Sequence, residues 1–438
     1  MTARRRVASA VLLVLLALLP GCGGGNNQGG GGGGGSITSV TVSCAEATLP
    51  VGLIDPCSAQ VHGTGAFNTA VTWSTTGGTV TSDGLVTLPS APGSVTVKAT
   101  AVGDSSKSDS VHVTVEAAQH AAFSYHGVTH VSWNSGEYAS PDGATSQDAL
   151  AATGTGWAGV LVTWYQANAT ATTISPQSYS PTDNDVISAI TELHSKGVKV
   201  MLKPHVDALD GSWRGTFQPS DPDAWFASFT NFIAHWALIA QAQGVEMLCI
   251  GTEYAQLTGN SNLARWTNVI NAIRADYTGA LAYAANATYG GDEFTSVAFW
   301  DQVDVIGLDA YFPLTNHNDP TLAELVAAWS NNRNGENIVA AIENFAGAHP
   351  GKPLIFTEIG YRSVAGANTA PWDFSMPGAV DLMEQQDCWE AMYQVWSQHT
   401  SAMNGNFWWA WPVPAPGSGD TDYNPRNKPA QTVLQNWD

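Results

Sequence analysis

The sequence contains little charge, and basic residues are especially scarce. Lysine and arginine together number 16, against 37 aspartates and glutamates in 438 residues, which gives a formal net charge of -21. Nucleic acids and anionic membrane surfaces are bound mainly through basic patches, so this balance argues against either as the main partner. A chain of this length is expected to fold into two or three domains.

Several chemical signatures are also missing. No spacing of cysteine or histidine resembles a metal site, so we expect neither a metal nor a cofactor. No Gly-rich phosphate-binding turn follows an early strand, which disfavours an open sheet that binds a dinucleotide. No G-x-S-x-G segment appears, which makes a Ser-His-Asp hydrolase a weak alternative.

The apolar run near the start of the chain is too short to span a bilayer. Three arginines precede this run, which covers 7–19 and is typical of an export signal. It ends in LPGC at 19–22, which resembles a bacterial lipoprotein cleavage site, although Pro20 is unusual there. We therefore expect 1–22 to be a lipoprotein signal peptide. Lipidation of Cys22 would anchor the exported protein at the bacterial cell surface or outer membrane.

The next segment, 23–36, is nearly all Gly, Asn and Ser. A chain of this composition cannot bury apolar surface, and it should behave as a coil with a root-mean-square span of about 20 Å. We interpret it as a flexible linker that tethers the folded part.

Residues 37–116 show the alternation of a small antiparallel sandwich. Short segments rich in Val and Thr, such as DSVHVTVE, are separated by Gly, Pro, Asp and Ser. The segment VTWSTTGGTVTSDGLVT, followed by GSVTVKATA, resembles bacterial immunoglobulin-like domains of group 2. No cluster of catalytic residue types lies in this region, so we interpret it as a spacer or a weak adhesion module.

Four cysteines follow Cys22. Cys44 and Cys57 bracket a short loop within the small domain, and export permits disulfides, so we predict that these two are bridged. Cys249 lies in an apolar strand and Cys388 in an amphipathic helix. For these two, buried free thiols are the better interpretation.

From Ala121 onward, apolar strands alternate with amphipathic helices. The candidate strands are 126–133, 157–165, 198–206, 245–252, 280–286, 303–311, 353–358 and 405–411. Asp221 and Gly244 bound one clear helix as cap and stop, with Pro222 in its first turn. This pattern predicts a (β/α)8 TIM barrel over 121–438, with an open doubly wound sheet as the alternative fold.

Two glutamates follow barrel strands, where catalytic side chains of such barrels lie. The fourth strand, VEMLCIGTEYA, leads to Glu253, and the seventh, PLIFTEIGY, leads to Glu358. Strict alternation places Glu253 on a face with Gly251 and Cys249, and Glu358 on a face with Phe356 and Leu354. Both carboxylates can therefore point into one cavity. Glycoside hydrolysis requires this arrangement, because one group protonates the leaving oxygen while the other attacks the anomeric carbon.

These segments resemble clan A glycoside hydrolases, which carry an acid on strand four and a nucleophile on strand seven. Within the clan, MLKPHVD, CIGTEYA, VDVIGLDAYFPL and FTEIGYRS, in this order, look like family 113, whose known members are β-mannanases. The resemblance covers about 123–438. It implies that Glu253 is the acid/base and Glu358 the nucleophile, with Tyr311 donating a hydrogen bond to the latter. Many clan members carry Asn where this chain has Thr252.

Other residues near strand ends are candidates for contact with the sugar. Because Thr252 replaces the asparagine, Asn286 or His205 could hold the sugar 2-hydroxyl. Asp309 could order the site from below, and a long loop places Trp213 at the cleft wall. The chain has 17 tryptophans, and three near strand ends are candidates for stacking on pyranose rings. These three are Trp133, Trp164 and Trp411. Trp408 and Trp409 have opposite facing, so at least one of them should pack against helices.

These observations favour a surface-anchored, retaining endo-glycosidase that acts on β-1,4-mannan or a related β-linked polysaccharide. An alternative in the same class is a β-glucanase or an exo-acting β-glycosidase. An alternative in a different class is a non-catalytic lipoprotein that binds carbohydrate. The expected partners are a polysaccharide or oligosaccharide substrate and, through Cys22, a membrane, but no nucleic acid.

Overall fold

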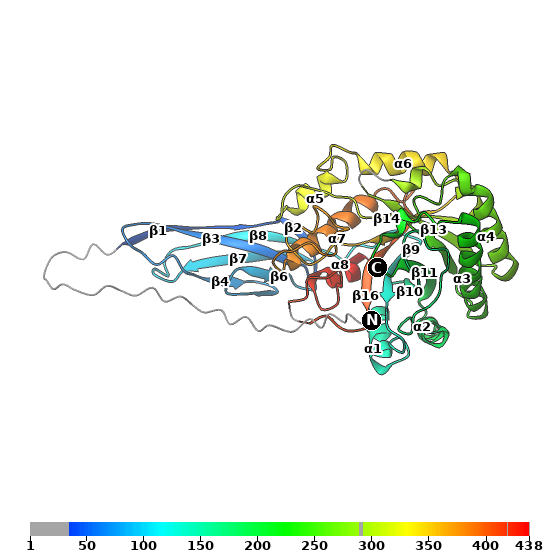
Figure 1. The fold of residues 1–438 in the computed structure, drawn as a ribbon. Coiled ribbons are helices and arrows are strands. Elements are labelled where there is room, and N and C mark those ends of the chain that lie inside the picture. Colours follow the sequence, from blue (N-terminus) through cyan, green and yellow to red (C-terminus); the bar gives the residue numbers. More distant parts are fainter. Residues whose placement is uncertain (1–34, 289–291, 418, 438) are drawn as a thin grey trace, which may run out of the picture.

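The computed structural model describes residues 35–288, 292–417 and 419–437 (Figure 1). A closed, parallel, eight-stranded barrel follows two four-stranded sheets, which confirms the predicted fold class of a TIM barrel with an N-terminal all-β region. The predicted signal peptide, with Cys22, and nearly all of the predicted linker lie outside the described residues. Within the described ranges, no helix is both long and apolar enough to cross a membrane.

The N-terminal region contains two sheets, in the strand orders β1-β3-β6-β5 and β2-β8-β7-β4. Their strands are β1 (Ser36–Cys44), β2 (Thr48–Pro50), β3 (Ile54–Thr64), β4 (Val71–Thr75), β5 (Thr79–Val80), β6 (Leu85–Thr87), β7 (Gly93–Ala101) and β8 (Ser108–Glu116). Alternate side chains are buried, as in the run Val95, Val97 and Ala99 of β7. A disulfide between Cys44 and Cys57 joins β1 to β3. The relationship of this region to immunoglobulin-like domains stays a prediction.

The barrel strands occur in the order expected from the sequence. They are β9 (Tyr125–Val131), β10 (Trp157–Gln166), β11 (Lys199–Ala208), β12 (Met247–Thr252), β13 (Ala280–Ala287), β14 (Val305–Ala310), β15 (Leu354–Ile359) and β16 (Gly405–Pro412). The helices are α1 (Pro141–Ala151), α2 (Asp183–Ser195), α3 (Pro222–Ala242), α4 (Leu263–Asp276), α5 (Leu322–Ala328), α6 (Ile338–Ala348), α7 (Leu382–Trp396) and α8 (Pro429–Trp437). Figure 1 shows them wrapped around the barrel.

Helix α3 illustrates how local signals set these elements. The Asp221 side chain accepts a hydrogen bond from the Ala224 N–H, and Pro222 opens the helix. Past the end of the helix, Gly244 has φ +67°, a conformation that favours glycine. An aromatic stripe on this helix packs against the sheet, where Phe232 and Trp236 contact Trp164 of β10. The buried members of the stripe are Trp225, Phe229, Phe232 and Trp236.

The outer layer departs from eight regular strand-helix units. In the described residues between β13 and β14, the chain makes only the short 3-10 turns η3 (Glu293–Thr295) and η4 (Trp300–Gln302). Two helices, α5 and α6, then lie between β14 and β15. Large side chains replace the missing helix, because Phe299 and Trp300 pack against the ring of Tyr283 on β13.

The sandwich contacts the barrel near α7 and α8, and its far end points away from the barrel (Figure 1). The Gln386 side chain of α7 accepts a hydrogen bond from the Ile54 N–H and donates one to the Ile54 carbonyl, both at 3.0 Å. Asn436 of α8 donates to the Val51 carbonyl at 2.8 Å. These contacts pair backbone groups of the sandwich with side chains of the barrel and restrict relative motion of the two parts.

Buried acidic groups lie near this contact. Burial raises the pKa of Asp55, on β3, to about 7, and the charge of Glu46 adds to the rise. Burial likewise raises the pKa of Asp387, on α7, to about 7. The folded chain therefore binds more protons than the unfolded chain between about pH 4 and 7. The free energy of unfolding therefore decreases as the pH rises through this range and increases as the pH is lowered.

Asp55→Asn should remove the contribution of Asp55 to this pH dependence of stability. We expect the variant to be more stable than the unaltered protein at pH 8, by on the order of 3 kcal/mol, with a much smaller difference at pH 5. Thermal or denaturant unfolding at the two pH values measures this. Asp83→Asn, in an exposed turn of the same domain, is the control and should bring no gain. An equal gain at both pH values would contradict the explanation.

Candidate active site

Glu253 and Glu358 line one cavity at the carboxyl ends of the barrel strands. Glu253 directly follows β12, and Glu358 is the second-to-last residue of β15. The cavity has a volume of about 570 Å³. Its lining residues are Trp213, Arg214, Glu253, Asn286, Thr288, Tyr311, Glu358, Trp372, Phe374, Trp409 and Tyr423. Both carboxylates are nearly buried, with exposures of 8% for Glu253 and 5% for Glu358.

Strict alternation of side chains along β15 predicted the wrong residues on the face that Glu358 shares. Phe356 packs against Trp329 and Trp396 in the helical layer, so it faces away from the cavity. Thr357 instead faces the barrel interior, where its hydroxyl donates to Asp309 at 2.8 Å. The ladders on both sides of β15 are irregular just before its end. This irregularity lets consecutive residues 357 and 358 both turn inward, which a regular pleat forbids.

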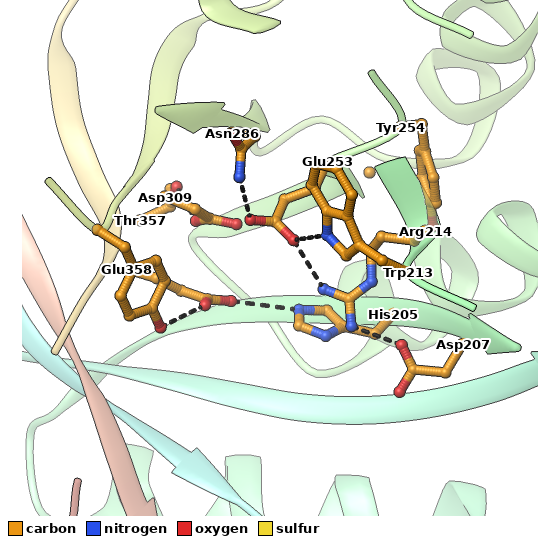
Figure 2. A network of polar contacts seen from close by, with 12 residues as sticks. His205, Asp207, Trp213, Arg214, Glu253, Tyr254, Asn286, Asp309, Thr357 and Glu358 are labelled. Carbon is orange, nitrogen blue, oxygen red and sulfur yellow. Dashed lines mark hydrogen bonds and ion pairs between the residues drawn. The ribbon is translucent and has the colours of Figure 1, made fainter. Parts of the chain in front are cut away.

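Three side chains hold the Glu253 carboxylate (Figure 2). Asn286 donates to Oε1 at 3.0 Å, and the Trp213 indole donates to Oε2 at 3.1 Å. The Arg214 guanidinium lies 3.5 Å from Oε2 and also pairs with Asp207 at 2.5 Å. The Glu253 backbone has φ +55°, in the left-handed region that residues other than glycine rarely adopt. This geometry turns the side chain into the cavity at the end of β12.

A lysine and a tyrosine hold the Glu358 carboxylate. Lys203, on β11, donates from Nζ to Oε1 at 2.5 Å, and Tyr311 donates from its hydroxyl to Oε2 at 2.9 Å. The same ammonium donates to Asp309 at 3.0 Å. Lys203 is fully buried, so its charge is stable there only because these two carboxyl groups surround it.

The surroundings shift the pKa values of three buried groups of the site in different directions. Burial alone would lower the pKa of Lys203, but the charges of Asp309 and Glu358 outweigh this and raise it, so the ammonium stays charged. Burial and the charge of Glu358 raise the pKa of Asp309 well above its ordinary value, against the effect of Lys203. Burial, with the charges of Arg214 and Lys203, lowers the pKa of His205 well below its ordinary value, so its ring is neutral.

Several residues proposed from the sequence meet at this site. Asn286 and Tyr311 contact the two glutamates directly, and Asp309 lies beneath the cavity on Lys203. His205 is buried beside Glu358, with its Nε2 3.6 Å from Oε1. That nitrogen has no hydrogen-bond partner among the described residues.

The three tryptophans proposed to stack on sugar are not grouped in the cavity. Trp164 packs against Phe232 and Trp236 of α3, because it shares a face of β10 with the outward-pointing Val160 and Val162. That prediction was wrong. Trp133 lies at the rim, 42% exposed, with its ring 6.3 Å from that of Trp409.

The prediction for Trp411 was also wrong. It is fully buried, and its indole donates to the Ser146 carbonyl of α1 at 3.1 Å. The ladder between β16 and β9 is irregular between residues 408 and 411, which turns Trp411 toward the helices. Trp409 takes the cavity position instead and stacks with His205, while Trp408 stacks on Trp389 of α7.

Sequence reasoning missed several residues of the site. Lys203 lies two residues before the inward-facing His205 on β11 and therefore shares its face of the strand. The position of Lys203 beneath the cavity could have been predicted from this pattern. Arg214 begins the short 3-10 turn η1 (Arg214–Thr216), and Trp372 and Phe374 lie in a loop, so no periodic pattern indicates the direction of these side chains. These side chains complete the cavity wall.

Comparisons with known proteins agree with this geometry. A family model described as Glycoside Hydrolase Family 113 matches residues 128–428, more than half of the chain. A solved family 113 β-1,4-mannanase is 26% identical, with a TM-score of 0.63, over 71% of this chain and 97% of that one. A family 113 β-mannanase from Alicyclobacillus acidocaldarius is 29% identical, with a TM-score of 0.61, over 72% of this chain and 97% of that one. No curated protein sequence matches the chain.

Lys203→Met should disable the site by leaving Asp309 and Glu358 without a counter-charge. We expect kcat/KM to fall at least about 100-fold, because Lys203 no longer donates to Glu358 and no longer holds its carboxylate in place. The free energy of unfolding should fall by about 3–5 kcal/mol. Lys199→Met, an exposed position on the same strand, is the control and should retain activity. Full activity of Lys203→Met would contradict this role.

Proposed function

The chain belongs to glycoside hydrolase family 113, and we propose that it is a retaining endo-glycosidase acting on β-1,4-mannan or a related β-linked polysaccharide. Family membership makes it a glycoside hydrolase whose substrate is a polysaccharide or oligosaccharide. The solved structures that are 25–29% identical are described as β-mannanases, which supports mannan as the substrate. The observation that carries the mechanism is the different environment of Glu253 and Glu358 within one cavity.

In the first step, Glu358 attacks the anomeric carbon. Its carboxylate is suited to this because Lys203 and Tyr311 donate to its two oxygens and hold it in place. As the carbon–oxygen bond to the leaving sugar breaks, Glu253 gives its proton to the departing oxygen. The products of this step are a free sugar hydroxyl and a glycosyl ester on Glu358.

In the second step, water releases the glycosyl group. Esterification removes the negative charge of Glu358, so Glu253, now ionised, takes a proton from water as the water attacks the anomeric carbon. Glu358 leaves as a carboxylate, and Glu253 is again protonated. Two inversions at one carbon give a product with retained anomeric configuration.

His205 is our candidate for contact with the sugar 2-hydroxyl. Asn286 is already engaged by Glu253, whereas the neutral His205 ring has a buried nitrogen without a partner close to Glu358. Such a contact would strengthen as charge develops on the sugar in the transition state. The Thr252 found in place of the asparagine of many clan members is the last residue of β12 and is fully buried.

Exposed aromatic rings around the cavity support action within a chain. Trp213, Trp372 and Phe374 are 48%, 42% and 78% exposed although they line the cavity. Exposed rings at a cleft are suited to stacking on pyranose faces beyond the sugar that reacts. We therefore favour endo over exo action, and a panel of β-mannans and β-glucans with product analysis separates mannanase from glucanase and endo from exo.

Alanine variants of the two glutamates distinguish their roles. Glu358→Ala should lose at least about 10⁴-fold in kcat, and azide should restore turnover with a product of inverted configuration, because the anion fills the vacated face. Glu253→Ala should slow substrates with poor leaving groups far more than activated aryl glycosides, and azide should give a retained product. NMR of the first product identifies its anomer.

The reverse behaviour of the two variants would exchange the roles. Near-normal activity of both variants on every β-glycan would exclude the pair as the catalytic groups. In that case a protein that binds carbohydrate without cleaving it would become the better interpretation.

We also propose that the enzyme is exported and anchored through Cys22, with the segment 23–36 as a tether. Cys22→Ser should shift the protein from the membrane fraction to the soluble fraction with unchanged kcat/KM, because the barrel carries the whole site. Fractionation followed by an activity assay measures both. Retention in the membrane fraction would contradict the anchor, and loss of activity would show that the anchor contributes to catalysis.

A further inference from the structure

A third glutamate, Glu293, is buried close to the site without lining the cavity. It lies in η3, is 3% exposed, and accepts three hydrogen bonds. Its Oε1 accepts from the Tyr283 hydroxyl at 2.6 Å and from the Thr258 hydroxyl at 3.1 Å. Its Oε2 accepts from the Asn286 backbone N–H at 2.8 Å. Burying a carboxylate costs free energy, so the burial of Glu293 among three donors needs an explanation.

All three donors belong to segments that hold Glu253. Asn286, whose backbone is fixed by Glu293, donates from its side chain to Glu253 Oε1 at 3.0 Å. The Tyr283 hydroxyl, which donates to Glu293, accepts a hydrogen bond from the Tyr254 N–H at 2.9 Å. Thr258 lies in the short loop that follows Glu253. Glu293 thus connects the end of β13 with the loop after β12.

This connection coincides with the strained backbone of Glu253. The φ of +55° at this residue is unfavourable for a side chain with a Cβ, and surrounding contacts must maintain it. The Glu253 N–H donates to the Ala284 carbonyl at 2.8 Å, and the next N–H, that of Tyr254, donates to Tyr283. The strained turn is therefore held by hydrogen bonds on both sides, and Glu293 fixes one of the two acceptors.

We propose that Glu293 is a positioning residue for the acid/base Glu253, acting through Asn286 and Tyr283. This inference rests on the proposed role of Glu253. An ionised carboxylate suits the position because it only accepts hydrogen bonds, whereas an amide would point N–H groups at donors. Burial raises the pKa of Glu293 to about 7, while its hydrogen bonds from Tyr283 and Asn286 oppose the rise.

Glu293→Gln tests this proposal by the dependence of rate on the leaving group. A misplaced acid matters when the leaving oxygen needs a proton, and much less when it departs unaided. We expect kcat/KM on mannohexaose to fall at least about tenfold, and kcat/KM on a dinitrophenyl β-mannobioside to change less than about twofold. Tyr283→Phe should show the same selective loss, and the double variant should lose less than the product of the two single effects.

Glu390→Gln is the matched control. Glu390 is a fully buried glutamate of α7 that accepts from Trp437 and Gln394 and lines no part of the cavity, so its variant should retain both activities. Equal losses on the two substrates in Glu293→Gln and Tyr283→Phe, or no loss in either, would overturn the proposal. Glu253→Ala, assayed alongside, tests the premise separately, because absence of leaving-group dependence in that variant would instead contradict the proposed function.

Discussion

The site depends on one buried ammonium group. Lys203 has no exposed surface and lies between Asp309 and Glu358, in a region where an unpaired charge would cost several kcal/mol. The ammonium and the two carboxyl groups can be buried only together, so the ends of β11, β14 and β15 must meet in one arrangement. That arrangement fixes the position of Glu358 in the cavity. The tyrosine hydroxyl on its other oxygen fixes the plane of the carboxylate.

The second carboxylate is held in a different way. Glu253 accepts hydrogen bonds from two neutral donors, Asn286 and Trp213, and its nearest cation, Arg214, is partly neutralised by Asp207. Its position depends on a strained backbone and on the hydrogen bonds that surround it. An arrangement with a close, fully buried cation at one carboxylate and mainly neutral donors at the other suits one nucleophile and one proton carrier.

The sequence allowed the barrel, the order of its strands and both glutamates to be predicted, because each follows from periodicity and from the position of a polar residue after an apolar run. It failed where β-bulges interrupt the pleat. Strict alternation put Phe356 on the face of Glu358, and a position at the end of a strand suggested Trp411 for the cavity. Irregular ladders at the ends of β15 and β16 reverse both. Residues of loops and short turns, such as Arg214 and Trp372, reach the cavity through tertiary contacts, which periodicity does not report. Glu293 was not predicted because its significance lies in its hydrogen-bond partners.

In the proposed mechanism, Glu358 forms a covalent bond with the sugar while Glu253 carries the proton. Incubation with an activated 2-deoxy-2-fluoro-β-mannoside, which slows breakdown of the intermediate, followed by mass spectrometry of the intact protein and its peptides, tests this directly. The account predicts inactivation with one sugar residue attached, located on the peptide that contains Glu358. A label on Glu253, or inactivation-free turnover with products of inverted configuration, would contradict it.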